Sequence, residues 1–149
     1  MKKIYYFLMA AVAVMCVCSS CSKDEDGDVD SKSIVGTWNL VSDEGYEIYN
    51  GKKEEWKETY GGDKYRIITF NADGMGSEVY RYEYIEDTYK FNWKLNGNKL
   101  SIKYAGDDGV VAEWRVEKLT STTLVVAYEW ISSDGSIGEH TIRTFTRIK

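Results

Sequence analysis

The sequence predicts an all-β protein, an antiparallel up-and-down barrel of eight strands that follows an N-terminal export signal. From residue 33 onward, apolar and polar side chains alternate with a period of two, which places one face of each strand in a core. Turns rich in Gly, Asn and Asp separate the alternating runs, and no run carries an apolar stripe of helical period. Eight strands joined by short turns close most simply into a barrel, because closure removes the exposed sheet edges.

The first 20 residues have the three parts of a secretory signal. Residues 1–3 are positively charged, residues 4–17 are a run of 14 mostly apolar residues, and small residues then lead up to Cys21. A helix that spans a membrane needs roughly 20 apolar residues, so this run is too short for a retained anchor. We therefore expect residues 1–20 to be removed as a signal peptide.

Residues 18–21 resemble the lipobox of bacterial lipoproteins, with Cys18 in place of the usual Leu. The resemblance implies that Cys21 becomes the N-terminal residue, carries acyl chains and holds the protein at a membrane. Cleavage before Cys18 is an alternative, but Cys16 and Val17 are poorer small-residue neighbours.

Residues 21–32 are polar and acidic without periodicity, which predicts a solvated tether. The start of the tether resembles the lipoprotein export signal of Bacteroidota, which implies a location on the outer face of the outer membrane, facing the cell exterior. The residues that carry this second resemblance are Lys23, Asp24, Glu25 and Asp26.

The folded domain is expected to span residues 33–149. Its alternation is clear in residues 88–95, where Phe91 and Trp93 share one face and Lys90 and Asn92 share the other. Asn-Gly and Asp-Gly pairs supply the positive φ angles that tight hairpins need. The alternating runs predict strands at 34–42, 65–70, 76–85, 88–95, 99–105, 110–118, 123–131 and 137–148.

The segment 43–64 does not fit this pattern. Residues 46–49 followed by Asn50-Gly51 could start a small hairpin, whereas residues 52–57 could form a helical turn or a flap. A connection of this length is often functional or mobile. We expect it to form a lid over one end of the barrel.

Gly36-Thr37-Trp38, at the start of the first expected strand, resembles the Gly-x-Trp motif of the lipocalins. The closing residues 144–148 resemble the last strand of the lipocalin-like domain of Bacteroidota lipoproteins, and the resemblance covers residues 33–149. It implies a lipocalin-like barrel in which Arg147 packs on Trp38 as a cation–π pair, with Arg143 as the second choice.

Composition argues against several classes of function. The formal net charge of −5 argues against nucleic acid, which needs a clustered basic patch. No Cys follows Cys21, so the domain has neither a thiol nucleophile nor a Cys-based metal site. One His, His140, excludes a His-rich zinc site, and Val29 and Val35 stand where a calcium loop needs Gly and Glu. We expect no enzyme activity, no cofactor and no metal.

The aromatic residues are the remaining functional signal. They either fill the barrel as a core or line an apolar cavity open at one end. The first reading favours a filled barrel that binds an envelope protein, and the second favours a non-enzymatic module for a small apolar or glycan-derived ligand. The candidate ligand-binding residues are Tyr82, Phe91, Trp93, Trp114, Tyr128 and Trp130.

We predict that the protein isolated from membranes lacks residues 1–20 and carries acyl chains on Cys21. Several acyl chains anchor stably because each buried CH₂ contributes about 0.8 kcal/mol. Cys21→Ala should lose the acyl mass and leave the membrane fraction, whereas Cys18→Ala should keep both. An intact leader or an unmodified Cys21 in the mass spectrum would contradict the prediction.

Overall fold

A computed structural model describes residues 31–106 and 111–149 of the chain. In these residues the chain forms a four-residue helix, α1 (Ser31–Ile34), and nine antiparallel strands. The strands are β1 (Gly36–Tyr49), β2 (Lys52–Thr59), β3 (Tyr65–Phe70), β4 (Met75–Tyr82), β5 (Ile85–Asn96), β6 (Lys99–Tyr104), β7 (Ala112–Leu119), β8 (Thr123–Ile131) and β9 (Ile137–Arg147). No helix in this part of the chain is long and apolar enough to cross a membrane.

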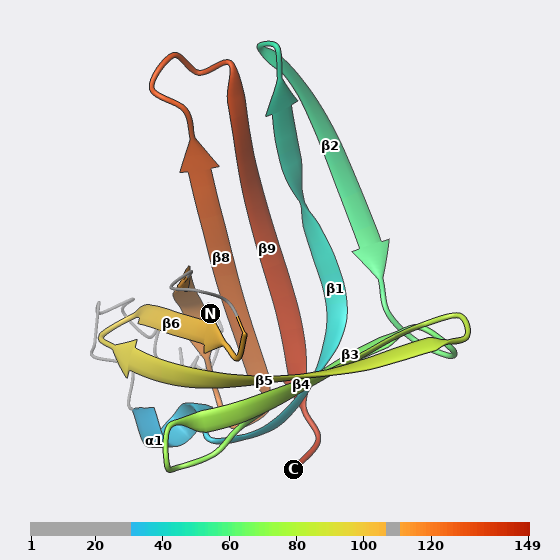
Figure 1. Cartoon of the computed structure of the whole chain (residues 1–149), viewed down its shortest axis with the longest axis vertical. Helices are drawn as coiled ribbons and strands as arrows, with labels where there is room; N and C mark the ends of the chain where they lie inside the picture. The colour runs from blue at the N-terminus through green and yellow to red at the C-terminus, as the bar shows by residue number, and fades with distance from the viewer. Residues whose placement is uncertain (1–30, 107–110) are drawn as a thin grey trace, which may run out of the picture.

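Eight of the described strands close into a barrel, and β2 lies outside the ring. The first residues of β1 pair with β3, and β1 also pairs with β9, which joins the two ends of the sheet. The second half of β1 pairs with β2 instead of β3. The predicted all-β antiparallel barrel is therefore confirmed, with one additional strand (Figure 1).

The expected lid at 43–64 is wrong. Residues 43–49 continue β1, and a two-residue turn at Asn50 and Gly51, with φ angles of 52° and 72°, leads into β2. Both φ angles are positive, as hairpin turns of this length require. The small hairpin that the Asn-Gly pair indicated does form, whereas the helical turn at 52–57 is a strand.

Several other boundaries differ from the expectation by a few residues, and two of these differences change where a side chain lies. Residues 31–34, partly assigned to the tether and to the first strand, form α1, and the buried Ile34 belongs to the core. The strand expected at 76–85 ends at Tyr82, so Tyr84 does not share a face with Tyr80 and Tyr82 but is 98% exposed in the turn. The expected signal peptide, Cys21 and the export tag lie outside the described residues.

The apolar core fills the lower half of the barrel. Every strand of the ring except β4 contributes inward-facing side chains to it, because alternate residues of a strand point to the same side. Its largest fully buried side chains include Trp38, Phe70 and Leu40. The buried hydrophobic cluster consists of Ile34, Trp38, Leu40, Ile68, Phe70, Phe91, Leu100, Ile102, Val116, Leu124, Val126 and Phe145.

Arg147 closes the lower end of the barrel. Its guanidinium carbon lies 4.0 Å from the centroid of the Trp38 ring, so the expected packing is confirmed. The same group donates hydrogen bonds to the carbonyl oxygens of Ser33, Val35 and Ser121, which ties α1 to the barrel. A methyl group at Gly36, whose φ is 143°, would overlap this guanidinium, which explains the glycine of the motif.

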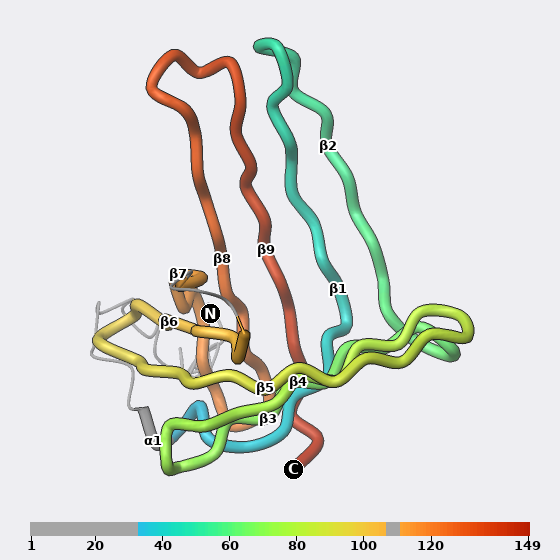
Figure 2. Tube along the Cα trace, in the orientation of Figure 1, coloured from blue at the N-terminus to red at the C-terminus, as the bar shows by residue number. Residues whose placement is uncertain are grey.

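The upper end is uneven. β1, β2, β8 and β9 rise well beyond the strands that cross beneath them, while α1 and the C-terminus lie at the lower end (Figure 2). The tall strands form a wall in which β9 pairs with both β1 and β8 up to the two hairpin tips. The upper end of the barrel is therefore bounded on one side by the extended strands β1, β2, β8 and β9.

We predict that Arg147→Lys lowers the free energy of unfolding by about 2–4 kcal/mol, because Lys cannot make the three carbonyl hydrogen bonds at once. Urea unfolding would measure the loss. Arg115→Lys is the matched control, since Arg115 is exposed and forms its ion pair with Glu117 on its own strand, and it should change little. Equal stability of the two variants would show that Arg147 does not hold the closed end.

Candidate functional site

One step above the apolar core, the inward faces of the strands become polar. Arg143 shares a face with the buried Phe145 of β9, and Arg66 shares one with Ile68 of β3. A bulge between Leu40 and Ser42 shifts the alternation of β1, so Asp43 faces inward opposite Arg143. The inward-facing polar side chains at this level are Asp43, Arg66, Glu78, Tyr104 and Arg143.

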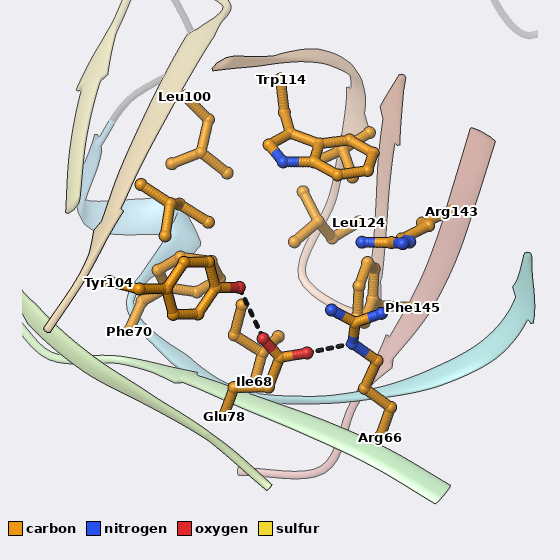
Figure 3. A pocket seen from close by; sticks show the side chains of 12 residues that line it. Arg66, Ile68, Phe70, Glu78, Leu100, Tyr104, Trp114, Leu124, Arg143 and Phe145 are labelled. Carbon is orange, nitrogen blue, oxygen red and sulfur yellow. Dashed lines mark hydrogen bonds and ion pairs between the residues drawn. The ribbon is translucent and has the colours of Figure 1, made fainter. Parts of the chain in front are cut away.

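Glu78 is buried and has both carboxylate oxygens engaged. Arg66 Nε donates to Oε1, and the Tyr104 hydroxyl donates to Oε2 at 2.6 Å (Figure 3). A buried carboxylate without partners would cost several kcal/mol, so these two donors are what allow Glu78 to lie inside the barrel.

Tyr104 has its hydroxyl fixed as a donor. Burial and the nearby Glu78 carboxylate raise the pKa of Tyr104, which keeps the phenol protonated at neutral pH. Its ring packs edge-on against the rings of Phe91 and Tyr89. The side chain is thus held by both its ring and its hydroxyl.

The second ion pair joins β1 to β9. Arg143 Nε donates to Asp43 Oδ2 at 3.1 Å, and the guanidinium carbon lies 4.5 Å from the centroid of the Trp114 ring. Asp43 Oδ1 is buried and has no hydrogen-bond partner in the described part of the chain. Burial raises the pKa of Asp43 against the opposing effect of Arg143, so the ionised carboxylate is held at an energetic cost.

These side chains form the floor of a cleft of about 770 Å³ that opens at the upper end. The volume falls in the range of about 300–1,000 Å³ that is typical of small-molecule sites. Beneath it, an apolar recess of about 30 Å³ between Leu100, Trp114 and Leu124 has room for little more than one water molecule. The cleft is lined by Asp43, Tyr60, Arg66, Glu78, Tyr80, Tyr89, Tyr104, Ala105, Gly106 and Arg143.

The candidate residues from the sequence lie in several places. Trp114 lies at the recess under the cleft, and Tyr128 packs beside it with ring centroids 5.5 Å apart. Phe91 belongs to the core, where it contacts Phe70. Two of the candidates therefore contact the cleft floor in the described structure, Trp114 through Arg143 and Phe91 through Tyr104.

The remaining three candidates lie away from the cleft. Trp93 packs against the core, and its indole N–H donates to the carbonyl oxygens of Asn71 and Met75. Tyr82 lies below the ammonium group of Lys64, outside the cleft. Trp130 is 51% exposed near the upper end of β8.

The charged residues of the cleft were not among the candidates. The sequence held a signal for two of them. Arg66 and Arg143 each lie two residues before an apolar core residue of the same strand, and therefore on the same face. A charged residue on an otherwise apolar face points inward and needs a buried partner. Nothing in the local pattern indicated Asp43, whose inward position depends on the bulge.

The chemistry available at the cleft is recognition through guanidinium and phenol groups. In the described residues, no group of three or more His, Cys, Asp or Glu side chains could hold a metal ion. His140 lies on the opposite face of β9, where its ring stacks on Tyr46 with centroids 5.1 Å apart.

We predict that Asp43→Asn gains stability relative to wild type as the pH rises from about 4 to 7. The raised pKa of Asp43 means that ionisation destabilises the folded state above its ordinary value of 3.8, and Asn removes that cost. Glu58→Gln is the control with the opposite sign, because the hydrogen bond from Lys64 lowers the pKa of Glu58. The effect of Glu58→Gln lies below pH 4.5, so urea unfolding from about pH 2 to 7 would measure both variants. If the stabilities of Asp43→Asn and wild type change in parallel over this range, the prediction is wrong.

Comparison with a known domain family supports the fold. The model of the lipocalin-like domain family matches residues 34–126. No curated protein matches the chain. A lipocalin-like protein from Bacteroides uniformis is 18% identical, with 78% of this chain and 99% of that chain covered and a TM-score of 0.48.

Two other solved structures are similar at 14% identity. Bovine odorant binding protein, in complex with a selenium-containing odorant, has a TM-score of 0.46 and is covered over 78% of its length by 86% of this chain. A mutant of transferrin binding protein B from Haemophilus parasuis has a TM-score of 0.44, with 78% of this chain and 27% of that chain covered. Because the family model matches more than half of the residues, including Gly36 and Trp38, the chain belongs to the lipocalin-like domain family.

Proposed function

We propose that this protein is a non-enzymatic binding module that holds one small molecule in the cleft above its core. The observation that carries the proposal is a cleft of about 770 Å³ whose walls combine tyrosine rings with two guanidinium groups. Sites for small molecules typically pair apolar or aromatic walls with a few polar groups that fix the orientation of the ligand.

The ligand is compact. The lower half of the barrel is filled by side chains such as Trp38 and Phe70, so a long acyl chain has no space to extend downward. The recess under the cleft is also far smaller than a lipid tail. A ring-sized molecule, apolar or derived from a glycan, fits against Tyr60, Tyr80 and Tyr89.

One observation favours a second candidate function, binding of an envelope protein. The tips of the two tall hairpins expose apolar side chains, with Tyr49 71% exposed and Trp130 51% exposed. Tyr49 lies opposite Ile137, which is also exposed. Such a patch is typical of contact surfaces between proteins. Tyr49→Ser with Trp130→Ser should weaken that function and leave small-molecule binding intact.

The location is part of the proposal. A signal peptide at 1–20, a lipid on Cys21 and the tag from Lys23 to Asp26 would place the domain on the outer face of the outer membrane, as in Bacteroidota lipoproteins. Support comes from the sequence alone, through the short apolar run and the small residues before Cys21.

We predict that a screen of small ring compounds, followed by ¹H–¹⁵N NMR, yields ligands that shift the amide signals of Tyr104, Ala105 and Gly106. The chain from Ser22 onward suits the experiment because it keeps every described strand pairing. Tyr89→Ala should weaken such ligands about tenfold by removing a ring contact. Tyr84→Ala, which alters a tyrosine outside the cleft, should not. Absence of cleft ligands, or equal effects of both variants, would refute the proposed site.

A further inference from the structure

We infer that the ligand of the cleft carries a carboxylate group, which lies between the guanidinium groups of Arg66 and Arg143. This inference rests on the proposed binding function and adds the chemical class of the ligand. Three features of the two buried ion pairs support it: the exposure of the guanidinium groups to the cleft, the contacts that hold them in place, and their unused hydrogen-bond donors.

The four charged side chains all line the cleft, but the arginines are more exposed than the carboxylates. The side chains of Arg66 and Arg143 are 22% and 21% exposed, whereas those of Glu78 and Asp43 are 4% and 8% exposed. A molecule that enters the cleft therefore meets positive charge and N–H donors first. This arrangement favours the binding of an anion. It disfavours a cation, because the guanidinium groups repel a positive charge strongly where water is partly excluded.

Each guanidinium retains unused donors. Both arginines donate from Nε to a protein carboxylate, and neither donates to any other side chain or carbonyl in the described structure. The Nη groups of both side chains are thus left for a ligand, and in Figure 3 the Arg66 guanidinium extends from β3 toward that of Arg143, which reaches the same pocket from β9. Paired N–H groups of a guanidinium match the two oxygens of a carboxylate.

The two groups are held in place before any ligand arrives. Arg143 lies over the Trp114 ring, and Arg66 is fixed by Glu78, which Tyr104 fixes in turn. Because these side chains are already ordered, little conformational entropy is lost when a ligand binds, and the ligand binds more tightly. Because Glu78 and Asp43 balance the arginine charges, the empty cleft also needs no permanent counter-ion, which suits reversible capture.

The tyrosines determine where the rest of the ligand lies. Tyr60, Tyr80 and Tyr89 line the cleft beside the arginines, and their rings offer apolar surface next to the anion site. A carboxylic acid that carries one ring on a short linker would contact the arginines and the tyrosine rings at the same time.

Three probes of one shape and different charge test the inference: phenylacetate, 2-phenylethanol and 2-phenylethylammonium. Titrations followed by ¹H–¹⁵N NMR should show the anion binding about tenfold or more tighter than the alcohol, and the cation weakest. Added NaCl should weaken the binding of phenylacetate and leave the binding of the alcohol unchanged.

Variants locate the anion site. The double variant Arg66→Gln with Glu78→Gln removes one guanidinium without leaving a buried carboxylate unpaired, and it should abolish most of the preference for phenylacetate. The matched control is Arg81→Gln with Glu86→Gln, an exposed ion pair that joins β4 to β5, and it should keep the preference. If the first double variant does not fold, Arg143→Gln with Asp43→Asn is the second test, because it removes the other guanidinium together with its carboxylate partner.

The outcomes separate this inference from the proposed function. If phenylethanol binds the cleft as tightly as phenylacetate, or the cation binds best, the carboxylate assignment is wrong while the binding function stands. If no probe binds the cleft, the inference is overturned, and the broader compound screen decides the binding function. A preference for the anion that survives in folded Arg66 and Arg143 variants would also overturn it.

Discussion

The pairing of β1 with β9 is the interaction on which the rest of the structure depends. It runs from Trp38 opposite Arg147 to Tyr49 opposite Ile137 and joins the first strand to the last. The same register sets Arg147 over Trp38 at the closed end and Arg143 beside Asp43 in the cleft, a contact between residues 100 positions apart. Contacts of such long separation form only when the chain ends meet, so the base and the cleft are completed together.

The charged residues above the core are not explained by stability. Taking a carboxylate out of water costs several kcal/mol, and buried ion pairs are often no more stabilising than apolar side chains of similar size. This barrel nevertheless has two such pairs, and Asp43 keeps one oxygen without a partner in the described structure. The orientation of both arginines toward a cleft gives these residues a role in recognition that an apolar core could not provide.

The sequence predicted the ring of strands because most of them have one buried and one wet face. β8, for example, matches its expected bounds at 123–131. The hairpin of β1 and β2 was only one of the alternatives for residues 43–64, because β2 is mostly charged and exposed and shows no apolar alternation. Ion pairs such as that of Lys57 with Glu44 lie along it instead.

The cleft was less predictable for a related reason. Strand parity can show that Arg143 points inward, but the residue it meets depends on the register between distant strands and on the bulge that redirects Asp43. The aromatic candidates were chosen for their ring size, and size favours the core as much as a binding site, as the burial of Phe91 shows.

The position of α1 has a consequence for how the barrel is presented. Arg147 fastens the carbonyl groups of Ser33 and Val35 to the closed end, so whatever precedes Ser31 joins the barrel opposite the mouth. If the preceding segment were fixed to a bilayer at its far end, the opening of the cleft would face away from the lipid headgroups, and solutes could enter it from the aqueous side.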